Sequence, residues 1–91
     1  MDKKILKSIL LDELGASAKE GERLQLPTGT RVTVFVSTAG VPIPITKVTA
    51  VTLKKEFAIL DSEEGRVFTS ADEFVALRAD EEADTSGRVG F

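Results

Sequence analysis

The sequence predicts a mainly β domain in which one N-terminal helix precedes five short antiparallel strands that bend into a small barrel. Apolar residues fall at helical spacing near the start of the chain and alternate with polar residues from position 31 onward. Clusters of turn residues separate the alternating segments. One helix and five strands are too few for a sandwich, but they suffice for a strongly bent barrel whose long second strand serves both halves.

The helix is expected over residues 3–14, with Asp2 as its N-cap and Gly15 as its stop. Three lysines lie early in it and two carboxylates late, which is opposite to the order that the helix dipole favours. Its stability should therefore come from docking an apolar stripe made of Ile5, Leu6, Ile9, Leu10 and Leu14.

Residues 15–30 (GASAKEGERLQLPTGT) are small, polar and interrupted by glycine and proline, so they are interpreted as a connector. The first strand follows at 31–36, where valines alternate with other residues. The second strand begins irregularly at 41–45, because two prolines there suit only an edge or a bulge. It continues over 45–53, and a slip in the alternation predicts a bulge that bends it.

Three further strands are expected at 57–60, 66–69 and 74–78. A hairpin loop separates the first two, and a tight polar turn at 70–73 separates the last two. The domain then comprises residues 1–79, with the barrel over 31–79. Residues 80–91 form an acidic tail whose composition predicts disorder.

Composition excludes several classes of function. The 91 residues include no Cys and no His, which removes disulfides, thiolate metal sites and the commonest catalytic base and metal ligand. A pairing of Glu56 with Asp72 for acid–base chemistry has no nucleophile or pocket signal beside it. We therefore expect no catalytic residues, no metal site and no cofactor, and classify the chain as a non-enzyme.

Charge and hydropathy bear on partners and location. The net charge of −3 comes wholly from residues 80–91, since residues 1–79 carry equal numbers of acidic and basic side chains. A nucleic-acid binder usually shows a basic excess, and this chain does not. No apolar run reaches the length of a membrane span or a signal peptide, so no membrane partner and a cytoplasmic location are expected.

A family resemblance is carried by two similar segments, residues 55–64 (KEFAILDSEE) and 72–82 (DEFVALRADEE). Residues 65–77 (GRVFTSADEFVAL) resemble the second Sm motif, with Ser70 and Ala71 where that family has Arg-Gly. Residues 56–64 (EFAILDSEE) are similar to the end of the first Sm motif, and closer to the Gln-Phe-Val-Ile-Leu of the bacterial host factor Hfq. The resemblance implies a divergent member of the Sm-like family with an SH3-like barrel.

The resemblance also implies partners and site residues. Members join their fourth and fifth strands edge to edge into a ring, so the chain is expected to form a homo-oligomer. The implied interface comprises Arg66, Val67, Phe68, Thr69, Phe74, Val75, Ala76 and Leu77. The implied site for single-stranded RNA comprises Lys54, Lys55, Phe57, Ser70 and Asp72. Because Ser70 and Ala71 replace Arg-Gly, binding is expected to be weak or altered.

Each assignment has an alternative. Phe57 is either a base-stacking residue or an apolar residue of the core or interface. Lys54 and Lys55 also fit a solvated turn, and Asp72 fits a turn cap. The acidic tail ending at Phe91 is either a docking peptide for a protein partner or a solubilising end. A second class of function is a scaffolding ring or adaptor that uses the same small barrel for protein contacts and binds no nucleic acid.

Overall fold

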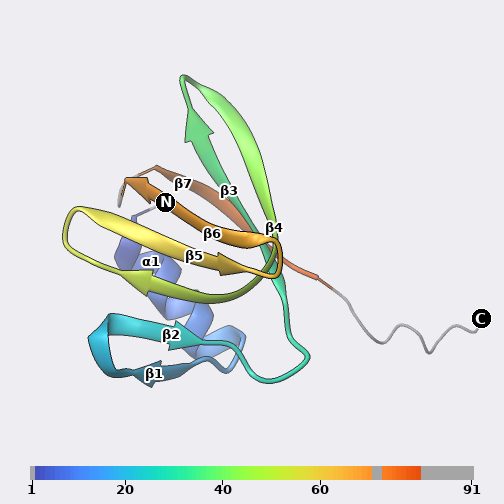
Figure 1. Cartoon of the computed structure of the whole chain (residues 1–91). Coiled ribbons are helices and arrows are strands. Elements are labelled where there is room, and N and C mark those ends of the chain that lie inside the picture. The colour runs from blue at the N-terminus through green and yellow to red at the C-terminus, as the bar shows by residue number, and fades with distance from the viewer. Residues whose placement is uncertain (1, 71–72, 81–91) are drawn as a thin grey trace, which may run out of the picture.

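The computed structural model describes residues 2–70 and 73–80, and Figure 1 shows how its elements are arranged. The chain opens with helix α1 and a π-helical turn, and then forms seven β-strands with one 3₁₀ turn among them. The elements are α1 (Lys3–Ser8), the π-helical turn (Ile9–Glu13), β1 (Ser17–Lys19), the 3₁₀ turn (Glu20–Glu22), β2 (Arg23–Gln25), β3 (Val32–Thr38), β4 (Val41–Leu53), β5 (Phe57–Ser62), β6 (Gly65–Ser70) and β7 (Phe74–Ala79).

The predicted N-terminal helix is confirmed. The Asp2 side chain accepts a hydrogen bond from the Ile5 backbone N at 3.1 Å, as an N-cap does. The helix widens at its C-terminal end, where the Leu14 backbone N donates to the Ile9 carbonyl at 3.1 Å. Leu6 and Leu10 are fully buried, whereas Ile5, expected on the docked stripe, is 51% exposed. Only part of the predicted apolar stripe therefore faces the sheet.

All described strand pairs are antiparallel, in the order β1-β2-β4-β3-β7, with β5 pairing both β4 and β6. The 13-residue β4 is shared: its first half pairs with β3, and its second half pairs with β2 and β5. Register shifts fall near Val48 in both the β3 and the β5 pairing, and Lys47 has a φ of 58°. The predicted irregularity that bends the long strand is therefore present.

Two expectations about the sheet were wrong. Residues 15–30 are not a plain connector, because β1 and β2 form a hairpin there and β2 pairs with β4. Burial of Leu24 and Leu26 against the core holds this polar segment in place. The sheet is also not a closed five-stranded barrel: within residues 2–70 and 73–80, β6 pairs only with β5 and β7 pairs only with β3.

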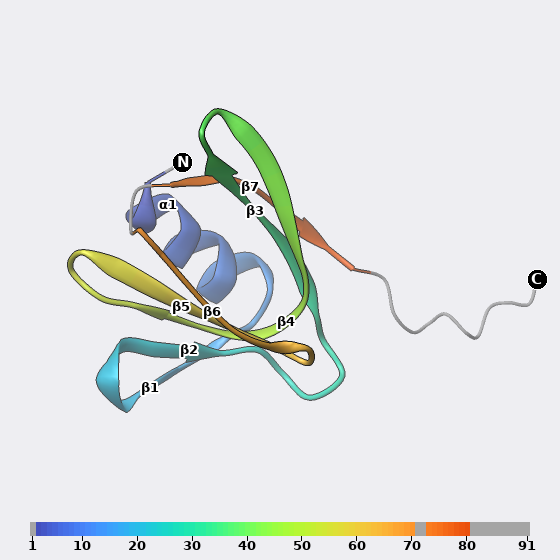
Figure 2. The same cartoon turned by 45° about the horizontal axis from the view of Figure 1, so that its top comes forward.

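Helix α1 occupies the bend of the open sheet. Figure 2 shows it between the arm formed by β2, β4 and β5 and the arm formed by β3 and β7. Leu6 of α1 and Leu10 of the π-helical turn join a core built from the inward residues of both arms. These inward residues include Val32, Val34 and Val36, as their alternation predicts. Phe74 at the start of β7 belongs to the same core. The helix thus covers the core, which in a closed barrel is enclosed by the strands themselves.

The last described residue is fastened to the sheet. The Asp80 backbone N donates to the Arg31 carbonyl at 3.0 Å, and the buried Thr33 hydroxyl donates to the Asp80 carboxylate at 3.1 Å. The Arg78 guanidinium donates to the Thr33 hydroxyl at 3.2 Å and lies 6.0 Å from the centre of the Phe35 ring. Asp80 therefore belongs to the folded part, while the predicted acidic tail beyond it lies outside the described residues.

We predict that Leu10→Ala destabilises the domain far more than Ile5→Ala. Truncating a fully buried leucine removes its burial and leaves a cavity, a loss of about 2–5 kcal/mol. Ile5 is half-exposed on the same helix, so its truncation should change the free energy of unfolding by less than about 1 kcal/mol. Urea unfolding followed by circular dichroism measures both. Equal losses in the two variants would contradict the placement of the helix in the bend.

Candidate nucleic-acid interface

Four of the five predicted RNA-site residues lie together at one end of β5. Lys54 and Lys55 form the turn before this strand, and Phe57 begins it. Ser70 is the register partner of Phe57 on β6, so the hairpin brings it beside the aromatic ring from 13 positions along the chain. Asp72 lies outside the described residues. The local part of the predicted site is therefore assembled by one turn and one strand pair.

The turn that carries the two lysines is held by backbone contacts. The Lys54 backbone N donates to the Phe57 carbonyl at 2.9 Å, which closes the turn. The Lys3 ammonium donates to the carbonyls of Lys54 and Lys55 at 2.8 and 3.1 Å, and so fixes the helix start to the same turn. The Lys54 ammonium lies 3.9 Å from Glu22 Oε1, whereas Lys55 is exposed and makes no ion pair within the described residues. Lys55 is therefore the cation best placed for an external anion.

Phe57 lies on the outer face of the sheet, 42% exposed, with Ile59 on the same face of β5. Ala58 and Leu60 take the inner face and are buried, so the interpretation of Phe57 as a core residue of its own subunit is wrong. The ring of Phe68, 61% exposed, has its centre 6.5 Å from that of Phe57, with a 32° tilt between the ring planes. Two exposed aromatic rings therefore lie side by side, a surface suited to stacking or to protein contact.

The pairing of Phe57 with Phe68 was not part of the predicted site, which placed Phe68 only at a subunit edge. The signal was present in the hairpin: a turn of two residues between Ser62 and Gly65 makes Ile59 the register partner of Phe68. Counting back from that turn puts Phe57, Ile59 and Phe68 on one face. The prediction missed it because the expected loop over 61–65 was longer than the turn that forms.

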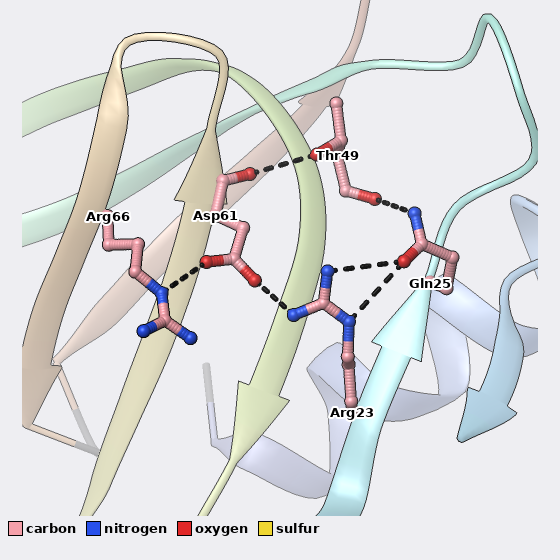
Figure 3. Close-up of polar contacts among 5 residues, drawn as sticks. All are labelled: Arg23, Gln25, Thr49, Asp61 and Arg66. Atoms are coloured by element: carbon pink, nitrogen blue, oxygen red, sulfur yellow. Dashed lines mark hydrogen bonds and ion pairs between the residues drawn. The ribbon is translucent and has the colours of Figure 1, made fainter. Parts of the chain in front are cut away.

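An ion-pair network lies next to the aromatic rings on this outer face, because Asp61 and Arg66 are register partners two residues along from Ile59 and Phe68. Figure 3 shows the five residues of this network. The Asp61 carboxylate, 15% exposed, accepts from Arg66 Nε at 3.0 Å and from Arg23 Nη1. Arg23 also donates to Gln25 Oε1 at 3.2 Å, and Gln25 Nε2 donates to the Thr49 carbonyl at 3.3 Å. The network joins β2, β4, β5 and β6, and its one carboxylate pairs with both arginines. They are therefore structural cations rather than free phosphate contacts.

The predicted interface residues divide into core and surface. Phe74 is buried, and Val67 packs against the core, so both stabilise their own subunit. Phe68 and Val75, the latter 44% exposed, are the large apolar side chains that β6 and β7 present to the surface. The pairing of β7 with β3 skips Val75, which marks a bulge. Each of these strands has one edge without a strand partner in the described part of the chain.

Other classes of site have less support. Across residues 2–70 and 73–80, no group of three or more His, Cys, Asp or Glu side chains is placed to hold a metal ion. No helix in this part of the chain is long and apolar enough to cross a membrane. No protein-family model matches the chain, and neither a curated protein nor a solved structure is significantly similar to it. Function must therefore be argued from the site itself.

We predict that Asp61→Asn lowers the free energy of unfolding by about 1–3 kcal/mol, because it removes the charge that two guanidinium groups share. Glu64→Gln is the control: its ion pair with Lys47 is 3.8 Å long, and both side chains are mostly exposed, so less than about 1 kcal/mol should be lost. Urea unfolding measures both variants. A loss for Asp61→Asn no larger than for the control would contradict a stabilising role for the network.

Proposed function

We propose that this chain is a subunit of an Sm-like homo-oligomeric ring that binds single-stranded RNA weakly through Phe57. The observation that carries the proposal is the exposed pair Phe57 and Phe68, with ring centres 6.5 Å apart, next to the exposed Lys55. Stacking on an aromatic ring contributes about 1–3 kcal/mol per base and tolerates any base. A neighbouring lysine adds a phosphate contact.

The architecture supports an Sm-like relationship. A helix precedes five consecutive strands, β3 to β7, and the second of these is long and bent. The two segments that resemble Sm motifs fall on β5 and on β6 with β7. The β1–β2 hairpin and the open sheet depart from the expected pattern. The proposal is therefore a divergent member in which the helix, rather than strand closure, completes the core.

Ring formation is supported by the free edges. Within the described part of the chain, β6 and β7 each have one edge without a strand partner, and such an edge offers backbone donors and acceptors to a neighbouring subunit. The exposed apolar side chains Phe68 and Val75 lie on these same strands. A closed ring pairs every such edge and leaves none for further growth.

A scaffolding ring or adaptor that binds only protein is the second candidate. It is favoured by the equal numbers of acidic and basic residues in positions 1–79, because nucleic-acid affinity depends strongly on cations. Asp61 also pairs with both Arg23 and Arg66 beside the aromatic rings and offsets one of their two positive charges. In this second function, Phe57 and Phe68 would form a contact with a protein partner instead of with bases.

We predict that short labelled oligo-U and oligo-A bind with similar affinity and a shallow salt dependence. Stacking is nearly independent of salt, and each phosphate neutralised on a single strand contributes a slope of about 0.7 in log affinity against log salt. Fluorescence polarisation at about 50 and 200 mM salt measures this slope. Phe57→Ala should weaken binding by about 1–3 kcal/mol, and Lys55→Gln should reduce the slope by the contribution of about one phosphate.

Lys47→Gln is the matched control for the lysine variant, because Lys47 is exposed and lies on β4 away from the aromatic pair. It should leave both affinity and slope unchanged. Absence of binding by the native chain, or equal binding by native and Phe57→Ala proteins, would reject the RNA proposal and favour the scaffolding ring.

We predict that the native chain sizes as a discrete oligomer at micromolar concentration and that Val75→Lys converts it to a monomer. A lysine at the exposed bulge of β7 opposes edge-to-edge pairing without entering the core. Val41→Lys introduces the same charge at an exposed valine of β4 and should leave the oligomer intact. Light scattering coupled to size exclusion measures the mass. A monomeric native chain would reject the ring in both candidate functions.

A further inference from the structure

A cavity of about 270 Å³ lies between α1 and the β1–β2 hairpin, and neither Phe57 nor Phe68 lines it. Leu24 of β2 and Leu53 at the end of β4 contribute apolar lining, together with Ala18 of β1. Figures 1 and 2 both show the hairpin beside the helix, and β2 holds it there through its pairing with β4. The cavity therefore has walls from three separate parts of the chain.

The same cavity is lined by five of the chain's 12 basic side chains: Lys3, Lys4 and Lys7 from the helix, and Lys19 and Arg23 from the hairpin. The one carboxylate in the lining belongs to Glu22, whose Oε1 lies 3.9 Å from the ammonium of Lys54. A chain without a basic excess thus concentrates its cations at one cavity, which creates a local positive field.

These cations differ in their existing contacts. Lys3 donates to two backbone carbonyls, and Arg23 is paired with Asp61, so both already have a structural role. Lys4, Lys7 and Lys19 are exposed and have no ion-pair partner among the described residues. Three ammonium groups from two elements are therefore available to an anion in the cavity.

The arrangement is unfavourable for the helix alone. Lys3 and Lys7 are four residues apart, and Lys4 and Lys7 three, so like charges lie on the same side of a helical turn. Lysines near a helix start also oppose its dipole. Local conflicts of this kind are expected where a residue serves a ligand, because a bound anion converts the repulsion into attraction.

We propose that this cavity binds the phosphate of a ligand the size of a mononucleotide. A phosphate monoester carries close to two negative charges and three acceptor oxygens, which matches three mobile ammonium groups better than a single carboxylate does. The apolar lining suits a base or sugar face, and the volume lies just below the range of about 300–1,000 Å³ for drug-sized ligands. The phosphate comes either from a free nucleotide or from the 5′ end of a single strand.

This site does not depend on the proposed function, since Phe57 and Phe68 are absent from the cavity lining. Calorimetric titration of the full chain with AMP, adenosine and inorganic phosphate tests it. AMP should bind about tenfold or more tighter than adenosine. Lys4→Gln combined with Lys7→Gln, and separately Lys19→Gln, should each weaken AMP binding by about tenfold and leave adenosine unchanged.

Lys47→Gln, which removes an exposed lysine elsewhere, should bind AMP as the native chain does. Urea unfolding of every variant establishes that the fold is retained. AMP binding no tighter than adenosine, or unchanged AMP binding in both cavity variants, would overturn the proposal. Tighter, lysine-dependent binding of an acidic pentapeptide would overturn it as well.

The source of the phosphate is distinguished by comparing oligo-A with a 5′-phosphate against oligo-A with a 5′-hydroxyl. A strand end as ligand predicts that the phosphorylated oligomer binds tighter than AMP and loses this advantage in Lys19→Gln. A free nucleotide predicts that AMP binds at least as tightly as the phosphorylated strand. Both results support the phosphate site, and binding of both oligomers that is equal in native and cavity variants argues against it.

Discussion

The bend of β4 at Val48 sets the arrangement of the remaining elements. Before this point β4 pairs with β3, and after it β4 pairs with β5 on one edge and β2 on the other. The positive φ of Lys47 and the register shifts beside Val48 turn the strand, so that one sheet becomes two arms. Arms that do not meet leave apolar side chains to cover, and the buried face of α1 covers them. The helix is therefore a required part of the core.

The sequence indicated the elements whose patterns are local and strong. Alternating valines predicted β3 and its buried face, and a capping Asp2 with spaced leucines predicted the helix. The β1–β2 hairpin escaped prediction because its two strands are three residues each, with polar side chains, and β2 is held by pairing with β4. Such a segment has little intrinsic preference for the strand conformation. Its conformation is set by tertiary contacts, which a local sequence pattern does not reveal.

The candidate site was likewise predictable only where its residues are close in the sequence. Lys54, Lys55 and Phe57 are neighbours in sequence, so they lie close together in any fold. Both faces of β5 carry apolar residues, and alternation alone therefore left the direction of Phe57 undecided. The short turn before β6 sets the register in which Phe68 lies on the same face as Phe57. This face is the outer one, where the two rings lie side by side. The cavity beside α1 could not be predicted from the sequence, because it lies between residues 3–7 and a hairpin that was itself not predicted.

Net charge is a poor guide to where this chain can meet an anion, because pairing redistributes the field within the fold. Asp61 pairs with both Arg23 and Arg66 and offsets one of their two positive charges, so these two arginines already have a partner beside the aromatic rings. Lys4, Lys7 and Lys19 have no such carboxylate within residues 2–70 and 73–80, and the one acidic group in the cavity lining lies close to Lys54. Residues 1–79, whose charges balance, thus present one surface with exposed aromatic rings and a separate cavity lined by lysines. The first offers exposed rings and the second offers ammonium groups, so different side chains would determine what each could hold.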